Sequence, residues 1–326
     1  EKIIMSSVDT LEKIRNEIIK SLPSNIEISR VEFEGPEIAV YTRDSKALVE
    51  DNDILRVLAK RMRKRIVIRT DPEVRLDSDK TVEFINNLVP ADAEITKIFF
   101  DDNLGEITIE AKKPGLVIGK MGVNLKEIRK QTLWRPKVVR TPPIESRTIL
   151  TVRNLLKSES KAQKDILLRI GRRIHRPQVY KKIRIRLTPL GGFREVGRSA
   201  VLVQTMDSSI LLDCGMNVGN PREPFPFLNS AEFDVENLDA VIVSHAHMDH
   251  SGMIPFLYKY GYDGPIYCTS PTRNLMTMLQ LDYLSLTKRE GRVAPYGKTE
   301  VKKEILHTIP LSWGKVTDIA PDIKLT

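Results

Sequence analysis

The sequence has few of the residues that define extracellular or membrane proteins. Only two of its 326 residues are cysteine, too few for a disulfide framework, which favours a reducing compartment. No apolar run approaches the ~18 residues needed to cross a bilayer, and no signal peptide opens the chain. Hydrophobic residues make up 41% and charged residues 29%, which excludes a disordered or collagen-like chain. We therefore expect a soluble, cytoplasmic protein with no membrane partner.

Positive charge is abundant but confined to one segment. The net charge is +9, which suggests a polyanionic partner. Residues 141–189 contain 13 Lys and Arg but only 3 Asp and Glu. By contrast, residues 71–140 are neutral and residues 190–326 are slightly acidic. The sequence thus predicts a basic connector between balanced modules and a slightly acidic domain.

The first 140 residues repeat one order of elements: helix, strand, strand, helix, strand. In residues 1–70, hydrophobic periodicity predicts helices over 9–21 and 45–63 and strands over 26–33, 37–42 and 65–69. In residues 71–140, it predicts helices over 78–88 and up to about 131, and strands over 95–100, over 106–111 and from 138. We therefore expect an internal duplication, with one module over 1–70 and a second over 71–140.

The second module contains a glycine-flanked turn, Gly119-Lys120-Met121-Gly122, between an apolar pair and a helix. Glycines let backbone N–H groups approach phosphates closely, and Lys120 adds positive charge. All four residues are therefore candidate RNA-binding residues. A plain turn at a helix start is the alternative. The first module lacks such a turn, so it serves either for packing or for contact with phosphates.

A basic connector over 141–180 follows, with a helix predicted over 152–175. Arg172, Arg173 and Arg176 are candidate contacts to an RNA backbone, because such a track neutralises phosphates. The alternative is a solvated helix that packs between domains. From residue 181 onwards, strands and glycine turns alternate with helices, which predicts a layered α/β domain over 181–326.

The most specific motif is Ser244-His245-Ala246-His247-Met248-Asp249-His250. The apolar strand predicted over 240–244 runs directly into it. Imidazole and carboxylate groups at this spacing suit zinc, so His245, His247, Asp249 and His250 are candidate ligands. A surface cluster of histidines and a mononuclear or structural zinc site are the alternatives.

This spacing resembles the metallo-β-lactamase family, which has an αββα fold. The stretch Gly191-Gly192-Phe193-Arg194-Glu195-Val196-Gly197-Arg198-Ser199 is similar to the start of the nucleic-acid-processing beta-CASP branch. The turn at 119–122 resembles the GxxG loop of K-homology (KH) domains. Taken together, the chain resembles archaeal homologues of the cleavage and polyadenylation specificity factor, in which two KH modules precede a metallo-β-lactamase/beta-CASP nuclease.

The resemblance implies a two-zinc ribonuclease. One zinc would be held by His245 and His247 and the other by Asp249 and His250. Asp249 would also be a candidate catalytic base, and Asp213 would orient the metal-binding loop through hydrogen bonds. The implied activity is endonucleolytic, with 5′–3′ exonuclease activity as a further possibility, at transcript 3′ ends and in transcription termination. The implied partners are single-stranded RNA, RNA polymerase, transcript-processing factors and a second copy bound through a C-terminal region.

The sequence departs from this family after His250. A further His ligand, a bridging Asp and a later proton-donating His are expected, but only His307 follows. Its setting lacks the family's next motif, and a strand histidine is the simpler interpretation. We therefore expect the chain to be the N-terminal part of a longer protein, without the remainder of the catalytic domain. Alone, it should bind metal weakly and hydrolyse little.

Two other functions compete with this interpretation. One is a small-molecule metallo-hydrolase of the same fold, although the basic connector and the GxxG turn argue against it. The other is a non-catalytic RNA-binding adaptor with an incomplete metal site. In either case, the predicted fold class is mixed, with two α+β KH-like modules followed by an α/β domain.

Overall fold

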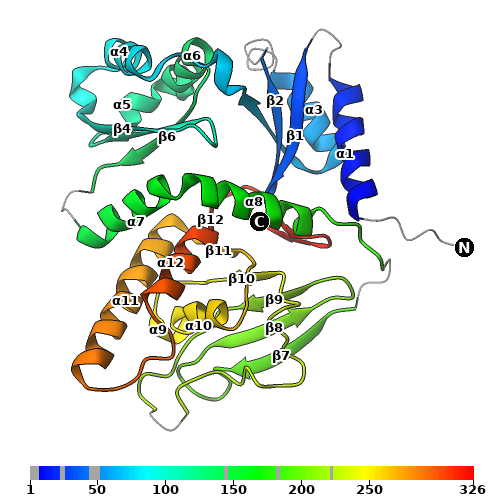
Figure 1. The fold of residues 1–326 in the computed structure, drawn as a ribbon, viewed down its shortest axis with the longest axis vertical. Helices are drawn as coiled ribbons and strands as arrows, with labels where there is room; N and C mark the ends of the chain where they lie inside the picture. The colour runs from blue at the N-terminus through cyan, green and yellow to red at the C-terminus, as the bar shows by residue number, and fades with distance from the viewer. Residues whose placement is uncertain (1–6, 23–25, 44–51, 143–145, 181–183, 221–222) are drawn as a thin grey trace, which may run out of the picture. The chain divides into compact units, whose positions relative to one another are not determined.

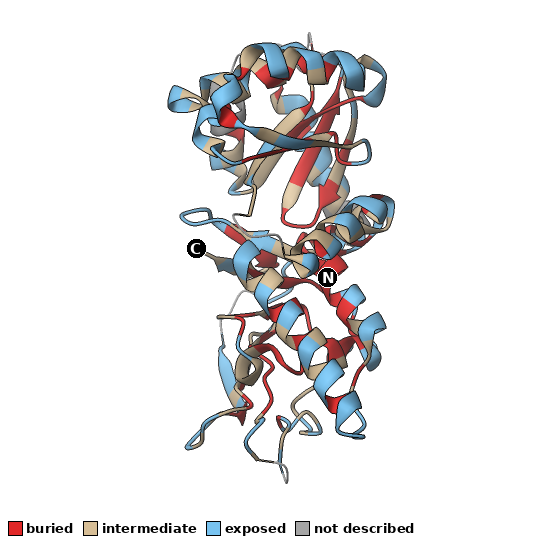
Figure 2. Ribbon diagram, turned by 90° about the vertical axis from the view of Figure 1, so that its left-hand side faces the viewer, coloured by how far each residue is buried: buried red, intermediate tan, exposed pale blue. Residues whose placement is uncertain are grey.

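The computed structural model describes residues 7–22, 26–43, 52–142, 146–180, 184–220 and 223–326 (Figure 1). The start of the helix expected over 45–63 lies outside these ranges, as do residues 181–183 of a strand expected over 181–187, where the structure has β7 beginning at Arg186. The chain forms an N-terminal unit over Val8–Arg147 and a C-terminal unit that includes Thr148–Thr326. No helix in the described parts is long and apolar enough to cross a membrane. In both units, buried residues follow the strands (Figure 2).

The first repeat of the N-terminal unit is a three-stranded sheet with two helices. Its elements are α1 (Ser7–Ser21), β1 (Ile28–Glu34), β2 (Glu37–Thr42), α3 (Asn52–Met62) and β3 (Arg65–Thr70). Strand β2 pairs antiparallel with β1 and parallel with β3. Its core contains Ile18, Val40, Leu58 and Ile68, one from each of α1, β2, α3 and β3. The spacing of these apolar residues therefore accounts for the packing of helices on the sheet.

The second repeat has the same topology. Its elements are α4 (Ser78–Leu88), β4 (Ile95–Asp101), β5 (Glu106–Ala111), α5 (Pro114–Ile118), α6 (Val123–Thr132) and β6 (Arg135–Arg140). Short 3-10 turns lie at Pro72–Val74, Ala91–Ala93 and Lys120–Gly122. Strand β5 is antiparallel to β4 and parallel to β6. The predicted repetition of one element order is therefore confirmed.

The two repeats share a network of buried and half-buried charges. Arg69 is 4% exposed, and its guanidinium contacts Glu34 of its own repeat and Glu106 of the other, each at 2.8 Å. Arg135 of the second repeat contacts Glu37 of the first at 3.3 Å and Glu106 at 3.1 Å. Burial alone disfavours the charged guanidinium, but Glu34 and Glu106 outweigh it and raise the pKa of Arg69. Each repeat therefore supplies both cations and anions to the contact.

The C-terminal unit is built on a six-stranded sheet in the order β12-β11-β10-β9-β8-β7. Its strands are β7 (Arg186–Gly191), β8 (Ala200–Gln204), β9 (Ser209–Leu212), β10 (Ala240–Ile242), β11 (Ile266–Thr269) and β12 (Thr308–Leu311). Strands β9 to β12 are parallel, whereas β8 is antiparallel to both of its neighbours. The carboxyl ends of the four parallel strands therefore meet at one edge of the sheet.

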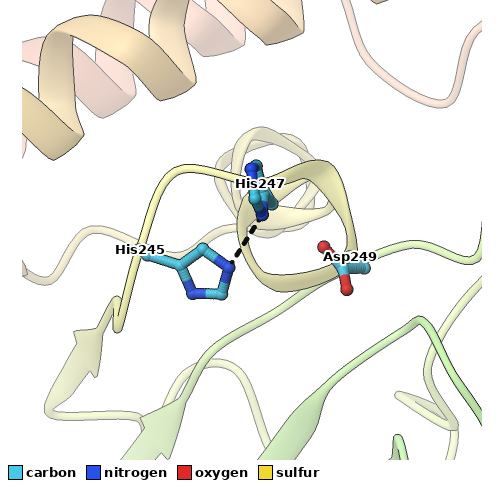
Figure 3. A group of neighbouring side chains, drawn as sticks. All are labelled: His245, His247 and Asp249. Carbon is cyan, nitrogen blue, oxygen red and sulfur yellow. Dashed lines mark hydrogen bonds between the residues drawn. The ribbon is translucent and has the colours of Figure 1, made fainter.

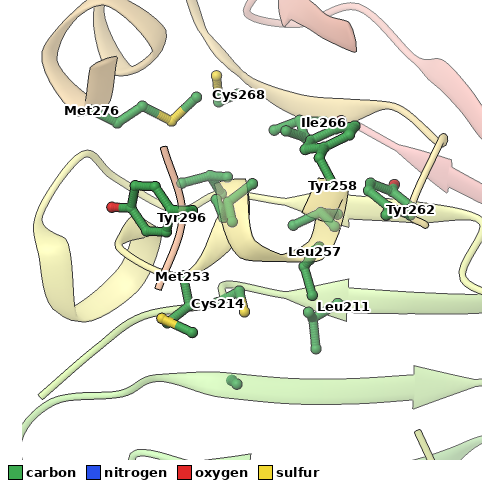
Figure 4. Close-up of a cluster of buried hydrophobic side chains, with 14 of the residues drawn as sticks. Leu211, Cys214, Met253, Leu257, Tyr258, Tyr262, Ile266, Cys268, Met276 and Tyr296 are labelled. Atoms are coloured by element: carbon green, nitrogen blue, oxygen red, sulfur yellow. The ribbon is translucent and has the colours of Figure 1, made fainter. Parts of the chain in front are cut away.

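Helices cover one face of this sheet, and a small hairpin packs against the other. The helices are α9 (Met248–Ser251), α10 (Ile254–Lys259), α11 (Ser270–Arg289) and α12 (Lys298–His307). They enclose a core that includes Cys214, Cys268, Met253 and Tyr296 (Figure 4). The hairpin consists of β13 (Thr317–Ala320) and β14 (Ile323–Leu325), and Ile319 packs on the opposite face. The edge of the sheet at which the parallel strands end is therefore lined by loops and not by core residues.

Two expectations about helices need correction. The single helix predicted over 152–175 is two helices, α7 (Arg147–Ser158) and α8 (Ser160–Ile174), with a break at Glu159. His307, interpreted as a strand histidine, is the last residue of helix α12. Its Nδ1 lies 2.8 Å from the Lys303 carbonyl oxygen, one helical turn earlier.

Candidate metal centre and nucleic-acid interface

Asp213 organises the loop that carries the histidines. It follows β9 directly, is 8% exposed and has a positive φ of 60°. Its carboxylate accepts hydrogen bonds from the Ser244 backbone N at 2.8 Å and from the Ser244 hydroxyl at 2.9 Å. The same carboxylate lies 2.7 Å from Nδ1 of His250. Because β9 and β10 are neighbours, these bonds join the loops that leave their two carboxyl ends.

His245, His247 and Asp249 come together just beyond β10 (Figure 3). One possible ligand atom from each lies within 4.8 Å of the other two. Nε2 of His245 is 3.1 Å from Nδ1 of His247, and the ring of His250 packs on His245 at a centroid distance of 4.0 Å. Nε2 of His250 is 3.5 Å from the Asp249 carboxylate. Thus three of the four candidate ligands form one cluster and the fourth adjoins it.

The surroundings of His245 favour the neutral form of its imidazole. Burial, followed by the neighbouring His250 and His247, lowers the pKa of His245. A neutral imidazole offers a nitrogen lone pair, which is the form that binds a metal. Two imidazoles and a carboxylate within a few ångströms match the donor set of a divalent metal such as zinc. The residues present therefore fit the implied cofactor.

Glycine at position 215 allows the loop that carries the histidines to lie against the end of β9. A Cβ at Gly215 would lie 1.6 Å from the Asp249 carbonyl oxygen, so only glycine permits this approach. Backbone hydrogen bonds then hold the segments together, from Cys214 N to the His250 oxygen and from Ser199 N to the Asp249 oxygen, each at 2.8 Å. Sequence reasoning did not assign this role to Gly215.

Arg198 fixes the loop over 191–199 beside the loop that carries the histidines. It is 5% exposed, and its guanidinium contacts Glu195 at 2.6 Å and Glu223 at 3.0 Å and lies over the Phe227 ring. The hydrogen bond to Glu195 is the main reason for the lowered pKa of that carboxyl. Because Ser199 follows immediately, this anchoring positions the backbone that contacts Asp249. Only the Gly-rich motif around Arg198 could have indicated this role from sequence.

The turn over 119–122 projects from the second repeat between α5 and α6. Gly119, Met121 and Gly122 all have positive φ, at 74°, 55° and 76°. Met121 is 87% exposed, and no heavy atom would lie within 4 Å of a Cβ on Gly122. Lys120 belongs to the short 3-10 turn that leads into α6. The four predicted residues thus form an open turn at a helix N-terminus, where backbone N–H groups favour an anion.

The three candidate arginines of the connector differ in their surroundings. Arg173 contacts Asp263 at 2.8 Å, and Arg176 contacts Asp239 at 2.8 Å and the Asp207 carbonyl oxygen at 2.7 Å. These contacts fasten α8 to the sheet unit, as expected for a helix that packs against a domain. Arg172 is exposed. Of the three, Arg172 is therefore the best placed to meet an external phosphate.

His307 is not brought to the metal cluster. Its ring lies against Tyr258 at a centroid distance of 4.9 Å, and its Nε2 is 3.2 Å from Arg169 of α8. It is 7% exposed, and burial is the main cause of its lowered pKa. His307 therefore belongs to the contact between α8 and the helical layer.

Comparison with known families assigns three parts of the chain. Residues 8–75 match the family described as "Transcription termination factor FttA, KH domain". Residues 80–154 match the KH domain family, and residues 194–318 match the metallo-beta-lactamase superfamily. The expected combination of two KH domains with a metallo-β-lactamase domain is therefore confirmed, and a metallo-β-lactamase domain implies binding of a divalent metal.

Curated relatives extend the match to nearly the whole chain. "Transcription termination factor FttA" of Lokiarchaeum sp. is 58% identical over 317 residues, which cover 97% of this chain and 50% of the relative. The protein of the same name from Methanocaldococcus jannaschii is 52% identical, covering 99% of this chain and 51% of the relative. The chain spans about half the length of these relatives. It is therefore a homologue, over about half of their length, of the archaeal proteins named transcription termination factor FttA, with two KH domains followed by a metallo-β-lactamase domain.

Proposed function

We propose that this chain supplies the RNA-binding modules and the first metal ligands of a zinc-dependent ribonuclease that cleaves transcripts near their 3′ ends and promotes termination of transcription. The observation that carries the proposal is the cluster of His245, His247 and Asp249, held from β9 by Asp213. KH domains imply RNA binding, which favours a nucleic-acid substrate over a small molecule. The relatives' name associates proteins of this type with termination.

In this proposal, His245 and His247 hold one zinc, and Asp249 and His250 hold a second. When bound, zinc would polarise a phosphodiester and lower the pKa of a bound water. The protein's own contribution is orientation. Asp213 accepts a hydrogen bond from Nδ1 of His250, and the lone pair of Nε2 is then free to bind a metal. The Asp249 side chain is 36% exposed, so its carboxylate can also accept a proton from an attacking water.

The second module would guide single-stranded RNA through the turn over 119–122. Lys120 brings a positive charge and Gly122 leaves space for a phosphate beside the start of α6. RNA polymerase, transcript-processing factors and a second copy of the protein remain proposed partners. Arg172 is an additional candidate phosphate contact, because it is exposed whereas Arg173 and Arg176 pair with aspartates of the same unit.

The decisive experiment uses the complete protein, labelled single-stranded RNA and added zinc. We expect His247→Ala to reduce cleavage by at least ~100-fold while RNA binding stays within about 2-fold. Gly122→Asp should instead weaken binding, because it places a carboxylate beside the phosphate site, whereas exposed Lys80→Glu on α4 serves as the matched control. Cleavage unchanged by His247→Ala would refute the metal assignment.

A non-catalytic RNA-binding adaptor is the second candidate, because the described cluster contains three neighbouring donors and no second carboxylate. This function predicts RNA binding that depends on Gly122, with no cleavage by the complete protein at any zinc concentration. If the protein were a small-molecule metallo-hydrolase, added RNA would not inhibit hydrolysis of its substrate. The same assay therefore separates all three functions.

A further inference from the structure

Ser251 closes the loop that carries the candidate metal ligands. This histidine loop covers residues 244–250, and Ser251 follows it directly and is fully buried. The Ser251 backbone N–H donates to the His247 carbonyl oxygen at 2.9 Å. The Ser251 hydroxyl lies 3.0 Å from the Ala246 carbonyl oxygen and 3.1 Å from that of His247. The position of Ser251 therefore determines how the first two histidines of the loop lie relative to the last two candidate ligands.

The carbonyl group of Ser251 is held by Gln280, a side chain of the helical layer. Gln280 lies in the middle of α11 and is fully buried. Its Nε2 donates to the Ser251 carbonyl oxygen at 3.2 Å. Because a backbone carbonyl oxygen only accepts hydrogen bonds, the nitrogen of the amide, and not its oxygen, must face Ser251. Gln280 thus holds the end of the histidine loop from α11, in addition to Asp213, which holds the loop from the end of β9.

Glu304 of α12 accepts the second hydrogen bond of the same amide nitrogen. Its Oε1 lies 3.1 Å from Nε2 of Gln280, and Glu304 is also fully buried. Burial raises the pKa of Glu304, so the carboxyl group is mostly neutral at pH 7 and brings no uncompensated charge into the core. Both hydrogens of the Gln280 amide are therefore used, which restricts this side chain to one orientation.

Packing alone does not explain a glutamine and a glutamate at these positions. The same two helices otherwise contribute apolar side chains to the core, among them Met276, Val301 and Ile305. Burial of a polar side chain costs free energy, and one hydrogen bond between two such groups offsets only part of that cost. In addition, Oε1 of Gln280 and Oε2 of Glu304 have no hydrogen-bond partner among the described residues. A pair of apolar side chains would fill the same space at a lower cost, so the stability of the core does not account for this pair.

We propose that Gln280 is a positioning residue for the metal centre: it holds Ser251, and through Ser251 the histidine loop, in the geometry that binds zinc, while Glu304 orients its amide. This inference rests on the proposed function, since that function supplies the zinc. Gln280 itself touches neither the metal nor the RNA. Ser251, Gln280 and Glu304 are each 0% exposed within one unit, so the contacts between them do not depend on what covers its surface in the complete protein.

The first test measures the zinc affinity of the complete protein by competition with a chelating dye. We expect Gln280→Leu to weaken zinc binding about 10-fold, the lower end of the effect of removing a partner of a metal ligand. Thr287→Val is the matched control, because Thr287 is buried on the same helix and its hydroxyl donates to the Tyr283 carbonyl oxygen at 2.7 Å. This control loses a buried hydrogen bond within α11 and none to the histidine loop, so its zinc affinity should stay within about 2-fold of wild type.

A double variant separates positioning from stability. Gln280→Leu alone leaves the Ser251 carbonyl oxygen and Glu304 buried without this partner, so the metal-free protein should unfold at a lower urea concentration. In Gln280→Leu/Glu304→Leu, both polar side chains are replaced by apolar ones, and the urea midpoint should rise again. Zinc binding should nevertheless remain about 10-fold weaker than in wild type, because Ser251 is still not held. Zinc affinity that recovers together with stability would show a purely structural role and overturn the proposal.

The outcomes distinguish this inference from the proposed function. Unchanged zinc affinity in both Gln280 variants, with RNA cleavage lost in His247→Ala, overturns the positioning role and leaves the ribonuclease in place. Zinc binding that depends on Gln280, in a complete protein that does not cleave RNA, supports the positioning role and overturns the ribonuclease. If the wild-type protein binds no zinc, both are overturned. If Gln280→Leu alone does not fold, the zinc affinity of the double variant decides.

Discussion

The carboxylate of Asp213 lies 2.7 Å from Nδ1 of His250, although 36 residues separate them in the chain. The same carboxylate also accepts two hydrogen bonds from Ser244. One side chain therefore sets both the start and the end of the histidine loop. It also determines which nitrogen of His250 remains available to a metal.

The variant Asp213→Asn tests whether Asp213 positions the histidine loop and His250 for metal binding. Asparagine tolerates the positive φ of this position, so the backbone is kept while the charge and one acceptor are lost. We expect metal affinity of the complete protein to fall ~10–100-fold, as is typical when a partner of a ligand is removed. Zinc titration against a chelating dye measures it. Asp234→Asn, in an exposed turn, is the control, and an unchanged affinity in Asp213→Asn would contradict the assignment.

Gly215→Ala should displace the metal-binding loop. The new Cβ would lie 1.6 Å from the Asp249 carbonyl oxygen and 2.6 Å from the His250 nitrogen, so one of the two segments must move. We expect a loss of about 3 kcal/mol or more in unfolding free energy, measured by urea denaturation. Gly219→Ala is a matched control, because its nearest contact would be 3.6 Å away. Equal stability of the two variants would show that the close approach is wrong.

Glu304 should make stability fall with rising pH. It is fully buried on α12, and burial raises its pKa from 4.5 to about 8, although a hydrogen bond from Gln280 opposes this. Because the folded state holds the proton more tightly, its stabilisation is complete below pH 4.5 and is lost between pH 4.5 and 8. The slope approaches ~1.4 kcal/mol per pH unit. Glu304→Gln should flatten this slope in denaturation curves, whereas exposed Glu290→Gln should leave it unchanged.

Arg172 and Arg176 should differ in what they affect. Arg176 donates to Asp239, which is 7% exposed, so Arg176→Ala leaves this buried carboxylate with only the Ser209 backbone N–H at 3.0 Å and the more distant Arg173 at 3.7 Å. We expect it to lower the unfolding free energy by about 1–3 kcal/mol. Arg172→Ala should leave stability unchanged but reduce the salt dependence of RNA binding by about one phosphate contact. Binding isotherms at several salt concentrations check this, and a stability loss in Arg172→Ala alone would reverse the assignment.

Much of the site could be predicted from sequence because its residues lie close together in the chain. The apolar strand that ends at Ser244 and the four candidate ligands after it form one local pattern, and the apolar run over 240–244 predicts β10 at this place. The role of Gly215 is different. It depends on a contact with Asp249, 34 residues away, which no local pattern reports.

The helical errors have a related cause. Residues 305–310 are Ile-Leu-His-Thr-Ile-Pro, and so short a stretch with apolar residues at both ends does not distinguish a strand from a helix end. In the structure, Ile305 and His307 end α12 and only then does β12 begin. The break between α7 and α8 falls at Glu159, whose carboxylate contacts Lys302 of α12 at 2.6 Å. At both places, local propensity alone was ambiguous about where a helix ends.

The charge network between the two KH repeats has a mechanical consequence. Arg69 reaches from the first repeat to Glu106, and Arg135 reaches from the second repeat to Glu37. Pulling the repeats apart would leave the buried Arg69 without one of its carboxylates, which is costly. A force on the turn over 119–122, such as the pull of a bound RNA, would therefore be transmitted to the first repeat and would not simply rotate the second repeat against it. The first repeat, which lacks a GxxG turn, would then hold the second repeat, which has one, in position.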